Sequence, residues 1–119
     1  MFRVLLSACL MSATVALALP ADAGAVAREA GFPLQQWMIG NATPAMSREE
    51  YDRLEKVFQR IGAMAPSERG FEAWPAVSRA GAAAAARHDI EGARHACKDC
   101  HDNMRAEYKR TLRMRPLPR

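Results

Sequence analysis

Apolar residues recur at helical spacing through most of this chain, and no stretch alternates like a β-strand over more than a few residues. The clearest pattern follows residues 47–50, Ser-Arg-Glu-Glu, a capping box typical of a helix start. One apolar stripe comes directly behind it, made up of Tyr51, Leu54, Val57, Phe58, Ile61, Met64 and Ala65. The pattern predicts a helix that begins at Ser47 and is stopped by Pro66.

A shorter helix is predicted before this one. Phe32-Pro33 supplies its start, because proline is well tolerated at the first helical position, and its end is expected at about Gly40-Asn41. Leu34, Trp37 and Met38 then share one apolar face. The sequence leaves open whether residues 24–31 extend this helix upstream.

Two more helices are predicted after a loop over residues 66–74. Trp74-Pro75 opens the first, which continues through the alanine run 82–86, where small side chains let a neighbouring helix or a flat cofactor come close. Asp89 can cap the last helix. That helix ends before Pro116 and carries a continuous stripe of Ile90, Ala93, Cys97, Cys100, Met104, Tyr108 and Leu112. Because the connections are short, the predicted fold is all-α, an antiparallel up-and-down four-helix bundle.

Residues 1–23 are interpreted as a cleaved secretory signal peptide. Arg3 gives a positive start, the run 4–19 is almost uncharged and apolar, and residues 21–23, Ala-Asp-Ala, supply the small-x-small pattern of a cleavage site. A membrane-spanning helix would need about 20 apolar residues. Cys9 stands in a segment that resembles a lipoprotein box, but too little apolar sequence precedes it, so we assign it to the leader. We expect a periplasmic protein whose mature part, residues 24–119, is one domain.

Charge is distributed unevenly along the mature part. The chain of 119 residues has a net charge of +4, and the leader holds one cation and one anion. Residues 105–119 carry six basic side chains against Glu107. This basic tail is suited to an acidic protein or a lipid headgroup surface. Export makes nucleic acid a poor partner, and the sequence leaves a homodimer open.

The chemistry of the chain is concentrated in residues 97–101, Cys-Lys-Asp-Cys-His. Two thiols three residues apart lie one helical turn from each other, so both can bond to the vinyl groups on one edge of a porphyrin. The adjacent His101 offers an imidazole nitrogen to the iron. Random placement would give this arrangement roughly once in a thousand chains. The motif predicts one covalently attached haem c inside the bundle, held by Cys97 and Cys100, with His101 as the proximal ligand.

Two other interpretations of the same residues remain, a disulfide and a zinc site. An oxidising compartment permits a Cys97–Cys100 disulfide. A zinc ion would need four ligands, and only His88 and His95 are left to complete such a site.

A Cys-x-x-Cys-His motif near the C-terminus of an all-helical exported chain resembles the class II cytochromes c, the cytochrome c′ and cytochrome c-556 group of four-helix bundles. In class I cytochromes the motif lies near the N-terminus, whereas here eighteen residues follow His101. The class II pattern places an aromatic residue third and a basic residue fourth after the histidine. Met104 and Arg105 stand there, so only the basic position matches. The mature part is also short for that family, which favours a reduced variant.

The resemblance implies that the residue opposite His101 decides what the haem does. A methionine gives a low-spin electron carrier, and an apolar residue leaves five-coordinate iron that binds a small gas such as NO or CO. Met38 on the first helix is the candidate distal ligand, although methionine also serves as a gap-filler in cores. His88 and His95 are weaker candidates.

The leading hypothesis is therefore a mono-haem cytochrome that carries single electrons between redox partners, acidic or membrane-associated, and is not an enzyme. The alternatives are a gas-binding haem protein and a helical module with a Cys97–Cys100 disulfide. Arg94 and Arg105 are candidates to pair with haem propionates, or else belong to a solvated face. Aromatic residues that either line the haem pocket or form ordinary core are Phe32, Trp37, Phe58, Phe71, Trp74 and Tyr108.

Overall fold

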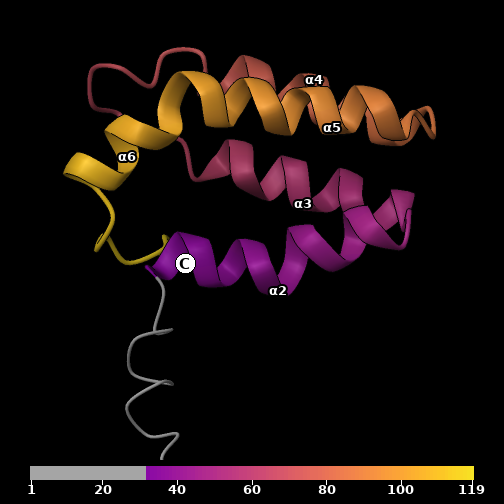
Figure 1. Ribbon diagram of the computed structural model, residues 1–119, viewed down its shortest axis with the longest axis horizontal. Coiled ribbons are helices and arrows are strands. Elements are labelled where there is room, and N and C mark those ends of the chain that lie inside the picture. The colour runs from indigo at the N-terminus through magenta and orange to yellow at the C-terminus, as the bar shows by residue number, and fades with distance from the viewer. Residues whose placement is uncertain (1–31) are drawn as a thin grey trace, which may run out of the picture.

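The computed structural model describes residues 32–119, and this part of the chain is all-helical (Figure 1). Its elements are α2 (Pro33–Ser47), α3 (Tyr51–Ala63), α4 (Trp74–Ala86), α5 (Ile90–Cys100), a π-helical turn η1 (His101–Arg105) and α6 (Ala106–Thr111). The predicted all-α class is confirmed for these residues. The predicted leader, with Cys9, and residues 24–31 lie outside the described residues. None of the described helices is long and apolar enough to span a membrane.

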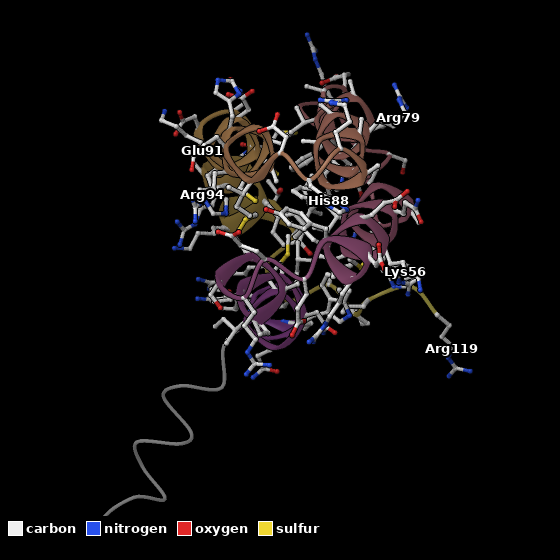
Figure 2. The ribbon with its side chains drawn as sticks, turned by 90° about the vertical axis from the view of Figure 1, so that its right-hand side faces the viewer. Lys56, Arg79, His88, Glu91, Arg94 and Arg119 are labelled. Carbon is white, nitrogen blue, oxygen red and sulfur yellow. The ribbon has the colours of Figure 1, made fainter. Side chains whose placement is uncertain are left out.

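The helices pack in chain order, α2 against α3, α3 against α4 and α4 against α5 (Figure 1). Viewed along the helices, α5 stands next to α4 and across from α2 (Figure 2). The C-terminal segment returns to the start of α2, where the Arg113 guanidinium lies 5.2 Å from the centre of the Phe32 ring. Helices α2 and α5 face each other across a cavity.

Helix α2 is longer than the sequence predicts. It passes Gly40-Asn41 and continues to Ser47 with Pro44 inside it. Proline has no N–H, so the carbonyl of Gly40 loses its helical partner. Arg53 of α3 donates to that carbonyl at 3.3 Å. A contact from another helix therefore satisfies the group that should have ended α2.

The predicted capping box is wrong. Ser47 is the last residue of α2, and its hydroxyl donates to the Pro44 carbonyl at 3.2 Å rather than capping α3. Helix α3 begins at Tyr51, after Glu50, without a side-chain cap. It ends at Ala63, before the predicted stop at Pro66.

The turns after α2 and α4 share one geometry. Each places a residue other than glycine in the left-handed region, Glu49 with φ 53° and His88 with φ 58°. The backbone N–H of each next residue donates back into the helix, from Glu50 to Ala45 at 3.0 Å and from Asp89 to Ala84 at 2.9 Å. This is the Schellman arrangement that closes a helix C-terminus. In the first turn it displaces the helix start expected at Ser47.

The small residues of α4 allow close helix packing, one of the two uses predicted for them. Helix α4 begins at Trp74 as expected, and its buried residues include Ser78, Gly81, Ala84 and Ala85. A Cβ atom at Gly81 would lie 2.2 Å from the Phe58 ring, so this ring of α3 rests on the α4 backbone. The Trp74 indole N–H donates to the Ile61 carbonyl at 2.8 Å and fixes the entry to α4.

The last predicted helix begins as expected but is interrupted. The Asp89 carboxylate accepts from the Gly92 N–H at 2.8 Å, which confirms the predicted cap. The π-helical turn η1 then separates α5 from α6. Within it, the Asn103 side-chain amide donates at 2.8 Å to the Asp99 carbonyl, the group that the Asn103 backbone N–H would reach in an α-helix.

Candidate functional site

Two adjoining cavities lie between α2 and the α5–η1 segment. Their volumes are about 380 and 250 Å³. They are contiguous, because Met38, Thr43, Cys100 and His101 line both. The larger cavity extends toward α3 and α4, and the smaller toward Trp74 and α6. Together they fall in the range of small-molecule and cofactor pockets, about 300–1,000 Å³.

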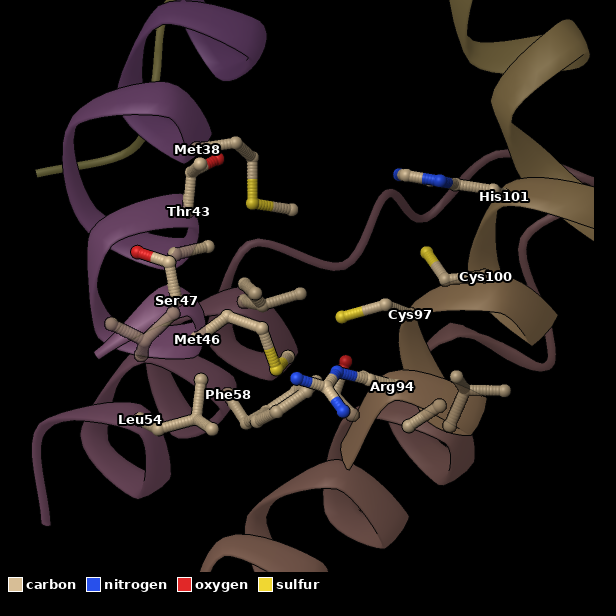
Figure 3. Close-up of a pocket in the computed structure, with 16 residues that line it drawn as sticks. Met38, Thr43, Met46, Ser47, Leu54, Phe58, Arg94, Cys97, Cys100 and His101 are labelled. Atoms are coloured by element: carbon tan, nitrogen blue, oxygen red, sulfur yellow. The ribbon is translucent and has the colours of Figure 1, made fainter. Parts of the chain in front are cut away.

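The structure brings the four predicted site residues to this space. Cys97 and Cys100 occupy the last turn of α5, and His101 begins η1. Figure 3 shows their thiols and imidazole on one wall and the Met38 thioether directed toward them from α2 on the opposite wall. Sulfur and nitrogen donors therefore face each other across an apolar space.

Both cysteines are free thiols and half-buried. Burial raises the pKa of the Cys97 thiol. Burial, and secondarily the neighbouring Cys97, raises the pKa of Cys100 to about 11. Thiols that stay protonated at neutral pH are weak nucleophiles, so the pair does not have the environment of a thiolate catalyst.

The electrostatics of His101 favour its neutral form. Partial burial and the positive charge of Arg105 lower the pKa of His101, and Asp102 opposes them with a smaller effect. A neutral imidazole keeps a lone pair for a metal ion. The π-helical turn that starts at His101 is a feature often found at functional sites.

The two other histidines lie elsewhere. The His88 imidazole stacks on the Tyr51 ring, with centroids 4.5 Å apart, at the turn after α4. His95 is exposed, and its Nδ1 lies 3.1 Å from an Asp99 carboxylate oxygen. Neither histidine lines the two cavities. Across residues 32–119 no three His, Cys, Asp or Glu side chains converge as a metal centre requires, so the zinc reading lacks a ligand set there.

The predicted aromatic residues divide between cavity and core. Phe58 lines the larger cavity, and Phe32, Trp74 and Tyr108 line the smaller. Phe71 is buried with its ring 6.1 Å from that of Trp74, and Trp37 packs partly buried against the core.

The two candidate arginines line different cavities. Arg94 lines the larger one and also pairs with Glu91. Arg105 lines the smaller one together with Lys109. Each part of the site therefore has a cation at its edge.

Sequence reasoning missed the second half of α2. Thr43, Met46 and Ser47 line the larger cavity, but α2 was expected to end before them. The signal was present in the sequence, because Met38, Ala42 and Met46 continue the four-residue spacing of one helix face.

The donor set and the walls suit a haem group. Two thiols and an imidazole stand on one side and a thioether on the other, within mainly apolar walls, and these are the kinds of group that could attach and ligate a c-type haem. No protein-family model, curated protein or solved structure matches this chain.

Proposed function

We propose that the mature chain is a periplasmic mono-haem c-type cytochrome that carries single electrons between redox partners. In this proposal the helices form an antiparallel up-and-down bundle around the haem. The observation that carries it is the placement of Met38 opposite His101 across one cavity, with Cys97 and Cys100 beside His101.

Each of these residues has a distinct role. Cys97 and Cys100 would hold the porphyrin edge through thioether bonds, His101 would bind the iron from the α5 side, and Met38 from the α2 side. The haem supplies exchange of one electron between ferrous and ferric iron. The walls are mainly apolar, and apolar surroundings with a thioether ligand favour the reduced state.

The position of Met38 favours electron transfer over gas binding. A five-coordinate site needs an apolar side chain above the iron, whereas a thioether directed at His101 can complete the coordination. The resemblance of the Cys97–His101 motif to class II cytochromes c supports the same bundle type.

The absorption spectrum of protein made with cytochrome c maturation machinery tests the proposal. We expect a low-spin haem spectrum, oxidised and reduced, that carbon monoxide leaves unchanged. A high-spin spectrum that shifts with carbon monoxide would favour gas binding. Absence of a Soret band would leave the helical module with a Cys97–Cys100 disulfide. Mass spectrometry of the exported protein should show cleavage after Ala23 and one covalent haem.

Two matched variants identify the distal ligand. Met38→Ala should convert the iron to a high-spin form that binds carbon monoxide. Met46→Ala is the control, because Met46 lines the same cavity from the same helix. If only Met46→Ala changes the spectrum, Met46 is the ligand, and if neither does, a methionine ligand from α2 is excluded.

A further inference from the structure

Two of the six cations of residues 105–119 are paired with carboxylates. Arg110 is paired with Glu107 at 3.0 Å and Arg115 with Glu68 at 2.9 Å. Arg105, Lys109 and Arg113 are exposed, and no carboxylate of the described residues forms an ion pair with them. Arg119, the last residue, extends away from the helices (Figure 2).

Arg105, Lys109 and Arg113 form a cationic stripe. Arg105 and Lys109 stand four residues apart along η1 and α6, and Arg113 follows in the turn after α6, which ends at Thr111. Arg105 and Lys109 line the smaller cavity, and Arg113 lies 5.2 Å over the ring of Phe32, which also lines it. The stripe therefore follows one edge of the cavity that His101 shares.

The opposite edge of this cavity is uncharged. Helix α2 contributes Gln35 and Ile39 there, and Ile39 is 60% exposed. No aspartate or glutamate lines the cavity. Arg105 and Lys109 are like charges four residues apart, and such pairs repel each other weakly on a helix, so an anionic partner would relieve this repulsion.

We propose that the cationic stripe is the docking surface for an acidic protein redox partner, seated beside His101. This inference rests on the proposed function, because it names where electrons enter and leave. Complementary charge raises the rate of encounter and orients the partner. Three cations fall short of the clusters of about four to eight that bind anionic lipids, which favours a protein over a membrane.

The first test measures electron exchange with small charged reagents. The double variant Lys109→Glu, Arg113→Glu reverses the charge at two of the three positions of the stripe and leaves the proposed haem ligands in place. The matched control is Arg79→Glu, Arg87→Glu, at one arginine on α4 and one directly after it, where both arginines are exposed and Arg79 points away from the bundle (Figure 2).

At low salt the stripe variant should react on the order of tenfold more slowly with ferricyanide, which is an anion. It should react faster with hexaammineruthenium, which is a cation. The control should show a much smaller change. At 1 M salt the difference should vanish, because the screening length falls to about 3 Å. Equal rates for the two double variants at low salt would overturn the inference.

The second test separates a protein from a membrane partner and needs no haem. Polyglutamate should perturb the backbone amide signals of η1 and α6 in NMR spectra, and the stripe variant should lose this effect. Phosphatidylserine vesicles should not retain the protein. Vesicle binding that requires the stripe, without polyglutamate binding, would contradict the protein partner. A missing Soret band in the wild-type protein would contradict the proposed function. Low-spin spectra combined with equal electron-exchange rates for the stripe and control variants would contradict only the docking inference.

Discussion

Substitution of Gly81 by alanine tests the close packing of α3 on α4. An ideal Cβ at this position would lie 2.2, 2.4 and 2.6 Å from three carbons of the Phe58 ring. The ring is only 4% exposed, and it lines the larger cavity. We expect Gly81→Ala to push the ring toward that cavity.

The expected loss follows from two opposing effects. Overpacking of a core costs about 1–3 kcal/mol, and a clash with three ring atoms belongs to the upper half of that range. Replacement of glycine by alanine in a helix returns about 1 kcal/mol. The net loss of unfolding free energy is therefore about 1–2 kcal/mol. For a domain of this size the Tm should fall by about 10 °C.

Gly40→Ala in α2 is the matched control, because no atom lies within 4 Å of its ideal Cβ. It should gain roughly 0.5–1 kcal/mol without a clash. Urea and thermal unfolding followed by circular dichroism measure both variants, and an unchanged urea m-value would show that the unfolded state is comparable. If Gly81→Ala is as stable as Gly40→Ala, the Phe58 ring does not rest on α4 and the packing described here is incorrect.

Three further predictions concern local interactions. Asp89→Ala should lower the unfolding free energy by about 1 kcal/mol in urea titration, because α5 loses its N-cap, whereas Asp89→Ser should retain most of it. Asn103→Ala should cost about 1 kcal/mol, because the π-helical turn loses its bond to the Asp99 carbonyl, and should shift the absorption spectrum of the haem that we propose; an unchanged spectrum would show that this turn does not influence His101. The hydrogen bond from Arg115 lowers the pKa of Glu68 below its usual 4.5, so this contact stabilises the fold above pH 4.5 and is lost as the pH falls through the lower folded value. In an NMR titration Arg115→Ala should return the pKa of Glu68 toward 4.5.

Local sequence was sufficient where a helix signal involves only neighbouring residues. Asp89 caps α5 through Gly92, three residues on, and Trp74-Pro75 opens α4. The residues of the Cys97–His101 motif lie within about one helical turn. Once α5 is helical, Cys97, Cys100 and His101 therefore line the same wall of the cavity. In these cases the interacting residues are close together in the sequence.

Prediction failed where one hydrogen-bond arrangement of the backbone competed with another. The end of α2 was misplaced because Arg53 of α3 satisfies the Gly40 carbonyl that Pro44 leaves free. The capping box at Ser47 failed because the turn after α2 closes through Glu49 in the left-handed region. Each depends on a balance between competing hydrogen bonds that local residue preferences describe poorly.

The sequence by itself determined that the described chain is helical and that two thiols and an imidazole stand together. Only the tertiary structure placed Met38 opposite His101 and left Arg105, Lys109 and Arg113 unpaired beside the same space. Helical periodicity specifies which residues share a face, because it depends on the geometry of one helix. Which faces meet depends on how side chains from separate helices fit together, as the Phe58 ring against Gly81 illustrates.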